Sequence, residues 1–159
     1  MPLGSINGTL QEAVENYFEP QDIEDNFCTS VCKQNRACNQ RYFLANPKIG
    51  LAIQVIRQED INSPAKRTDA LELGGNLTLP TVGGVMTEFA MVGVVEHLGT
   101  EVVNGHYCFF AFQDDHKYVI NDSLPIVEHV CTLSCTSNNY RSAASSCFRR
   151  GEIFMYRKV

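Results

Sequence analysis

The sequence predicts an α+β domain, in which one N-terminal helix is followed by a mostly antiparallel sheet. Apolar residues recur at helical spacing near the N-terminus, and from Tyr42 onward they alternate or form short runs between turn residues. A chain of 159 residues with 44% hydrophobic and 19% charged residues is typical of one globular domain. We place this domain at 6–159 and exclude residues 1–5, which look like a cloning remnant.

The helix is predicted over Thr9–Phe18. Thr9 and Glu12 have the spacing of a capping box, in which the hydroxyl accepts a backbone N–H of the first turn and the carboxylate reaches back to the cap. One face of this segment is apolar and comprises Leu10, Val14, Tyr17 and Phe18. Pro20 ends the helix.

Two polar segments follow the helix. The acidic stretch Glu19–Asp25 is expected to be an exposed loop, with contact to a basic partner as the weaker alternative. The short Cys-rich stretch Cys28–Asn39 suits a turn or a metal-binding knuckle.

Strands are predicted over most of the remaining chain. Ile49–Val55 alternates with the period of a half-buried strand, and the leucines of Leu71–Leu79 alternate on both sides of a turn at Gly74-Gly75. The long apolar run Glu88–Leu98 indicates a central strand that is buried on both faces.

The C-terminal third continues the sheet. Gly105–Phe112 and Lys117–Ile120 are expected to form a hairpin, with its turn at Asp114-Asp115. The Ser/Asn-rich segment 133–150 has no period and is expected to be a surface insertion, and Glu152–Lys158 closes the chain as a strand.

Charge and composition exclude several functions. The net charge is −5, with 13 basic and 18 acidic residues, so a phosphate-tracking nucleic-acid binder is not expected. No apolar run is long enough to span a bilayer. No signal peptide follows Met1, so we expect an intracellular protein of the cytoplasm or nucleus. In that compartment the seven cysteines are expected to be thiols or metal ligands.

His106 and Asn121 are the residues that point most clearly to chemistry. Two adjacent antiparallel strands can bring them side by side, and an acceptor on one imidazole nitrogen leaves the other nitrogen as a base. Together they supply two of the three members of a Cys-His-Asn arrangement. The alternative is a histidine at a strand start beside a polar turn.

Several motifs occur in the order seen in one known family. The central ones are His97-Leu98-Gly99 at the end of an apolar strand, Gly105-His106-Tyr107, Tyr118 and Asn121-Asp122. The flanking ones are Leu10–Phe18 with Glu19-Pro20, the pair Cys28 and Cys32, Pro47 before Leu51–Arg57, and Phe154–Arg157. Together they resemble the histidine box, fingers and palm of the ubiquitin-specific protease family. Tyr118 replaces the family's usual Trp.

The resemblance implies the roles of several residues. His106 would be the general base, Asn121 would orient it, and Asp122 would assist. The loop Gly99–Gly105 would be the blocking loop that handles the ubiquitin tail, and we include Tyr107 among the binding positions. The fold implied is a palm-like sheet over 46–159, with a remnant of the fingers and its helix over 9–45, and without the family's thumb.

The family's nucleophile has no counterpart in this chain. It lies in a cysteine box of the thumb, and a thiolate needs a base and an oxyanion site in register with it. Cys108 falls on the same strand face as His106, and we interpret it as a structural thiol. This chain alone is therefore not expected to cleave isopeptide bonds by the family mechanism.

A zinc site is a further alternative. The family's fingers use four thiolates, whereas here Cys28 and Cys32 match one pair at a stretched spacing and Cys38 offers a third ligand. We favour free thiols at these positions and expect no cofactor, with zinc as the alternative.

Two functions remain open from the sequence. The first is a non-catalytic interaction module, whose apolar face, uncovered without a thumb, binds a protein partner or forms a homodimer and can retain weak ubiquitin binding. The second is the C-terminal half of an active deubiquitinating thiol protease whose cysteine lies outside this chain. A structural metal-binding module is a third, more distant hypothesis.

Overall fold

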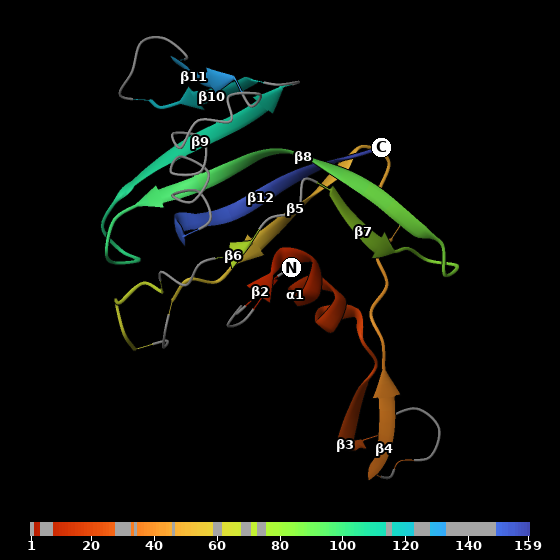
Figure 1. Cartoon of the computed structure of the whole chain (residues 1–159). Helices are drawn as coiled ribbons and strands as arrows, with labels where there is room; N and C mark the ends of the chain where they lie inside the picture. Colours follow the sequence, from red (N-terminus) through yellow and green to blue (C-terminus); the bar gives the residue numbers. More distant parts are fainter. Residues whose placement is uncertain are drawn as a thin grey trace.

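The computed structural model describes residues 2–3, 8–27, 33, 35–45, 47–58, 62–67, 71–72, 76–113, 116–122, 128–132 and 149–159. The main sheet runs in the order β1-β5-β12-β8-β9-β10-β11, and β7 also pairs with β8 (Figure 1). Its strands are β1 (Pro2–Leu3), β5 (Gly50–Val55), β7 (Asn76–Pro80), β8 (Met86–Leu98), β9 (His106–Gln113), β10 (His116–Ile120), β11 (Glu128–Thr132) and β12 (Gly151–Lys158). Two short pairs stand apart, β2 (Gly8–Thr9) with β6 (Leu71–Glu72) and β3 (Gln21–Phe27) with β4 (Asn35–Gln40). All pairs of the main sheet are antiparallel except β1 with β5, so the predicted α+β class is confirmed.

The predicted helix is α1 (Leu10–Phe18), with Thr9 as its N-cap. Both halves of the capping box are present: Glu12 N donates to Thr9 Oγ1 at 3.1 Å, and Thr9 N donates to Glu12 Oε2 at 2.9 Å. These bonds to the backbone and side chain of Thr9 lower the pKa of Glu12. The cap therefore fixes where the helix begins.

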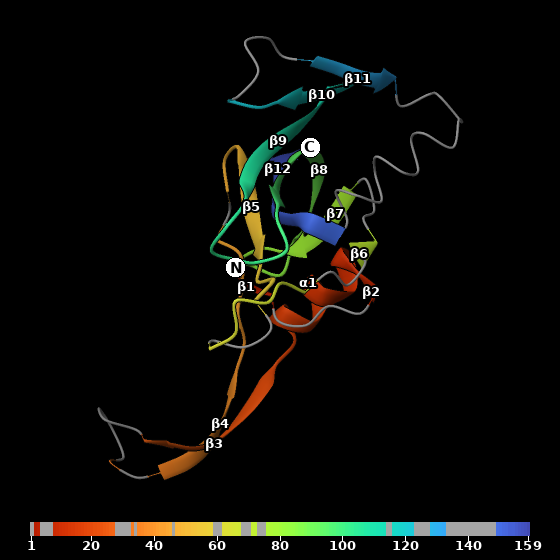
Figure 2. The ribbon, with the colours of Figure 1, turned by 90° about the vertical axis from the view of Figure 1, so that its left-hand side faces the viewer.

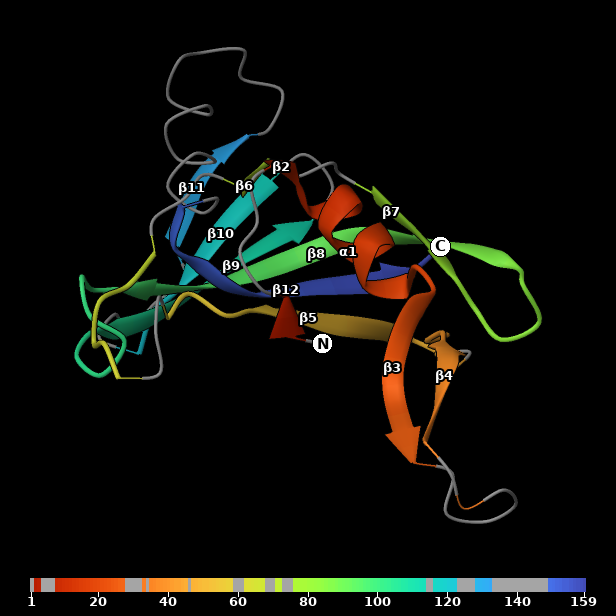
Figure 3. The same ribbon diagram turned by 90° about the horizontal axis from the view of Figure 1, so that it is seen from below.

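α1 packs on one face of the sheet (Figure 3). Its three buried residues join the core residues of the strands in one cluster of Leu10, Val14, Phe18, Ile53, Val55, Leu71, Leu77, Leu79, Phe89, Val94, Phe154 and Tyr156. Because side chains alternate across a strand, Ala52 and Met155, which are paired neighbours of Ile53 and Phe154, face the other side of the sheet. Both are exposed, so this second face has no comparable cover in the described part of the chain.

The predicted central strand Glu88–Leu98 is confirmed as part of β8. Its predicted burial on both faces is confirmed only in part. β8 pairs with β7, β9 and β12, and Phe89, Val94 and His97 on it are buried. Several residues of the second face, including Val92 and Val95, are only half-buried. β12 does not lie at the sheet edge, because it pairs with both β5 and β8.

The prediction of a polar loop after the helix was wrong. The acidic stretch belongs largely to β3, and the end of the Cys-rich stretch to β4; together they form a two-stranded arm that projects from the sheet (Figures 1 and 2). Asn39 Nδ2 donates to Asp22 Oδ1 across this pair at 3.1 Å. The sequence of this arm shows no regular alternation of apolar and polar residues, which is why the sequence pattern missed it.

Two further segments differ from the sequence-based expectation. Pro2–Leu3, which we excluded from the fold, pairs in parallel with β5, because its backbone groups complete an open sheet edge. Glu128–Thr132 was not predicted as a strand, yet it pairs with β10. The predicted hairpin turn at Asp114-Asp115 and residues 133–148 of the predicted insertion 133–150 lie outside the described residues.

Candidate functional site

The hairpin of β9 and β10 brings the predicted histidine and asparagine together. His106 begins β9, and Asn121 directly follows β10, whose last residue Ile120 pairs with Phe109. The Nε2 atom of His106 lies 2.6 Å from Oδ1 of Asn121. Asp122 Oδ1 lies 3.3 Å from the same nitrogen. The three side chains predicted from the histidine-box pattern thus meet at one point.

This contact has a chemical consequence for the imidazole. The amide oxygen of Asn121 can only accept a hydrogen bond, so Nε2 of His106 is the protonated nitrogen when the ring is neutral. Nδ1 then carries the lone pair that can take a proton. The His106 side chain is 39% exposed and that of Asp122 is 85% exposed, so the ring is accessible and the nearby carboxylate is well solvated.

Cys108 lies two residues beyond His106 and is buried. Burial, followed by the nearby carboxylates of Glu96 and Asp122, raises the pKa of its thiol. A thiol with a raised pKa stays protonated and is a poor nucleophile. The surroundings of Cys108 therefore agree with its interpretation as a structural residue.

The predicted binding positions lie around the loop 99–105 and the start of β9. Gly99 and Gly105 lie at the two ends of one loop, and a Cβ at Gly99 would lie 3.1 Å from the Gly105 Cα atom. Gly105 packs against the imidazole of His97, where a Cβ would clash with Nε2. Tyr107 is 54% exposed and, by strand alternation, points away from the face that holds His106. Gly105 and Tyr107 both contact the His97 ring, so the structure places both on the face of the sheet opposite to the His106 side chain.

A buried ionic cluster beneath the loop was not found by sequence reasoning. The Lys66 side chain has no exposed surface, and its Nζ lies 2.8 Å from Glu152 Oε1 and donates to the His97 carbonyl oxygen at 2.8 Å. Glu152 Oε2 accepts from the Tyr107 hydroxyl at 3.5 Å. Desolvation and then the Glu152 charge raise the pKa of Tyr107. Lys66 lies in a polar stretch of the sequence after Pro64, and nothing in that stretch indicates a buried charge.

The candidate metal ligands are not assembled by the described residues. Cys28 and Cys32 lie outside them, and Cys38 lies half-buried on β4. Within the described ranges, no group of three or more His, Cys, Asp or Glu side chains could hold a metal ion. The part of the chain described here also contains no helix long and apolar enough to cross a bilayer.

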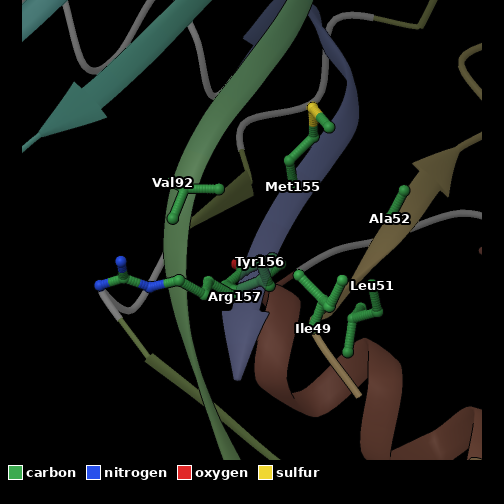
Figure 4. Close-up of a pocket in the computed structure, with 8 residues that line it drawn as sticks. Ile49, Leu51, Ala52, Val92, Met155, Tyr156 and Arg157 are labelled. Carbon is green, nitrogen blue, oxygen red and sulfur yellow. The ribbon is translucent and has the colours of Figure 1, made fainter. Parts of the chain in front are cut away.

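The uncovered face of the sheet carries an apolar groove. Its volume is about 460 Å³, and it is lined by Ile49, Gly50, Leu51, Ala52, Val92, Met155, Tyr156 and Arg157 (Figure 4). Ile49 is 81% exposed and Met155 is 39% exposed. The groove lies at the paired region of β5 and β12, on strands other than those that carry His106.

Comparisons with known proteins give structural matches only. No protein-family model and no curated protein sequence matches the chain. The structure of the yeast SAGA DUB module with an Sgf73 mutant matches 99% of this chain with a TM-score of 0.66 and 18% identity, over 34% of the matched chain. The SAGA Ubp8/Sgf11/Sus1/Sgf73 DUB module matches 100% of this chain with a TM-score of 0.64 and 18% identity, over 32% of the matched chain. A form of that module with a Ubp8 variant matches 99% of this chain with a TM-score of 0.62 and 19% identity, over 32% of the matched chain.

These matches establish the fold. The chain has the fold of a part of a DUB-module chain and spans about a third of the length of the chains it matches.

Proposed function

We propose that this chain supplies the general base and its orienting residue to a ubiquitin-directed thiol hydrolase, whose nucleophilic cysteine comes from a polypeptide segment outside this sequence. The observation that carries the proposal is the 2.6 Å contact between His106 Nε2 and Asn121 Oδ1. The sequence also left open a non-catalytic module. The base-supplying function is favoured because a binding module has no need of an oriented imidazole next to an accessible loop.

The proposed chemistry follows from the geometry of the ring. With Nε2 held by Asn121, Nδ1 of His106 would take the proton of an incoming thiol. The thiolate would attack the isopeptide carbonyl, and the imidazolium would return the proton to the leaving lysine amine. The choice of ubiquitin as substrate rests on the histidine-box resemblance and on the DUB-module fold. Cys108 does not fit the nucleophile's role because it is buried and its pKa is raised.

A chimera tests this proposal. In it, the chain replaces the matched third of the yeast DUB-module chain, and hydrolysis of a ubiquitin–fluorophore conjugate is measured. His106→Ala should lower the rate by about 10²-fold or more, as loss of a general base does. His116→Ala, at the far end of β10 from Asn121, is the matched control and should leave the rate unchanged. A folded chimera that binds ubiquitin but hydrolyses no faster than its His106→Ala variant would refute the proposal.

A second candidate is the non-catalytic interaction module, which is favoured by the groove beside Met155 and Ile49. Apolar surface of this kind commonly marks a contact with another protein. A protein partner or a second copy of the chain would then cover the groove. Titration of the labelled chain with ubiquitin by NMR, with light scattering on the same sample, tests the use of the groove. A monomeric chain whose shifts are confined to Gly99–Gly105 and His106 would speak against the groove as the interaction surface. A dimer whose interface includes Met155, without ubiquitin-induced shifts, supports the interaction module.

A further inference from the structure

Lys66 is a buried charge whose surroundings have no role in the functions considered so far. It lies in the irregular segment 62–67, yet its side chain has no exposed surface. A buried ammonium is costly unless it is paired and hydrogen-bonded. Here it is held by the carboxylate of Glu152 from β12 and by the carbonyl oxygen of His97 from the end of β8. One side chain thus joins three separate parts of the chain.

The backbone around Lys66 is paired with the loop that precedes His106. Lys66 N donates to Thr100 O at 3.3 Å, and Val102 N donates to Pro64 O at 3.0 Å. Ala65 and Glu101 form an isolated antiparallel bridge between these two bonds. The segment 62–67 therefore runs along one side of the loop 99–105 and holds its backbone.

The same cluster reaches the start of β9. His97 pairs with Tyr107, and the two rings lie 4.6 Å apart. Glu152 touches both residues, with Oε1 at 3.5 Å from His97 Nδ1 and Oε2 at 3.5 Å from the Tyr107 hydroxyl. Gly105 closes the arrangement, because its Cα packs directly on the His97 ring. The residues on both sides of His106 are thus in contact with side chains of the cluster.

We propose that Lys66 is a positioning residue, which through Glu152 and His97 fixes the loop 99–105 and thereby holds His106 in register with Asn121. Lys66 is not one of the two paired residues, His106 and Asn121. In the contacts described, it does not touch the His106 imidazole. It acts on both ends of the loop, since its backbone pairs with residue 100, its side chain binds the end of β8, and its partner Glu152 reaches Tyr107 at the start of β9. The inference goes beyond the proposed function, because it concerns the geometry of the pair with or without a nucleophile.

Lys66→Met tests this inference in the full chain, because methionine fills similar space without the charge. Amide hydrogen exchange of Val102 should accelerate by about tenfold or more when the loop loses its anchor, while exchange of the core amides of Val94 and Phe154 stays within about twofold. The ¹⁵N signals of His106 should also move from one tautomer toward a mixture of two. The second readout separates positioning from a purely structural role, because loosening of the loop alone would leave the ring tautomer unchanged.

Two further variants complete the experiment. Lys48→Met removes the same charge at an exposed position, and it should change neither Val102 exchange nor the His106 signals. Glu152→Gln keeps the size of the side chain and removes only the charge that faces Lys66, so it carries the same test if Lys66→Met does not fold. Unchanged Val102 exchange and an unchanged His106 tautomer in a folded variant would overturn the proposal. Because ubiquitin is absent from this experiment, its outcome is independent of the hydrolysis assay.

Discussion

His106 Nε2 lies 2.6 Å from Asn121 Oδ1, although fifteen positions separate the two residues in the chain. The hairpin of β9 and β10 closes this distance, and the register that pairs Phe109 with Ile120 fixes it. Asp122 lies next to the same nitrogen but is largely exposed. Backbone pairing therefore brings the two residues together, and a base with a defined tautomer follows from their contact.

The thiol of Cys108 should react slowly with alkylating reagents. Burial and two nearby carboxylates raise its pKa, so the reactive thiolate is scarce near neutral pH. In the folded chain, iodoacetamide should label the half-buried Cys38 faster than the buried Cys108, as measured by peptide mass spectrometry. In denaturant the two rates should converge. Faster labelling of Cys108 in the folded state would contradict its structural role.

Gly105→Ala should destabilise the loop that leads into His106. A Cβ at this position would clash with His97 Nε2 and would lie 2.8 Å from the carbonyl oxygen of Leu98, so the buried ring or the loop must move. We expect a loss of about 1–3 kcal/mol in the free energy of unfolding, measured with denaturant. Gly84→Ala gives a useful comparison: its φ is +77°, but no atom lies within 4 Å of the added Cβ, so strain there would be purely conformational. Only Gly105→Ala should also shift the His97 signals.

Phe89→Ala should be among the most damaging core substitutions. The side chain is fully buried on β8, in the cluster that includes α1. Removing it leaves a cavity, and we expect the free energy of unfolding to fall by about 3–5 kcal/mol. Met86→Ala, on the same strand but 57% exposed, should cost well under half as much. Equal losses from the two variants in denaturant unfolding would contradict the placement of the core.

The capping box should make stability depend on pH through Glu12. Its pKa is lowered in the folded chain by bonds to Thr9, so its contribution is present above the unfolded-state pKa and is lost as pH falls through the folded-state value. Glu12→Gln should therefore be less stable than the natural sequence at neutral pH, and the difference should shrink below about pH 4.5. Denaturant unfolding at several pH values measures this. A difference that grows on acidification would contradict the assignment.

The features predicted correctly from the sequence are those that local rules determine. Thr9 and Glu12 identify a helix start because a capping box needs only four residues. Alternation in Ile49–Val55 identifies a strand because one of its faces packs on the core. The meeting of His106 with Asn121 follows from the expectation of a simple hairpin between their strands.

The features that were missed depend on partners distant in the chain. The sequence of β3 and β4 has no regular alternation of apolar residues that would indicate paired strands. Pro2–Leu3 joins the sheet only because β5 has an open edge. Lys66 is an ordinary loop lysine in the sequence, and its burial appears only when Glu152 and His97 are placed beside it. Sequence spacing carries no information on such a contact.

The most direct test of the account is the ring ¹⁵N spectrum of His106 at about pH 8, where an ordinary imidazole is neutral. The spectrum is recorded for the natural sequence and for Asn121→Ala. The contact between His106 and Asn121 predicts one dominant tautomer with the proton on Nε2, and a mixture of tautomers in the variant. A mixture in both proteins, or a spectrum that Asn121→Ala leaves unchanged, would mean that Asn121 does not orient His106.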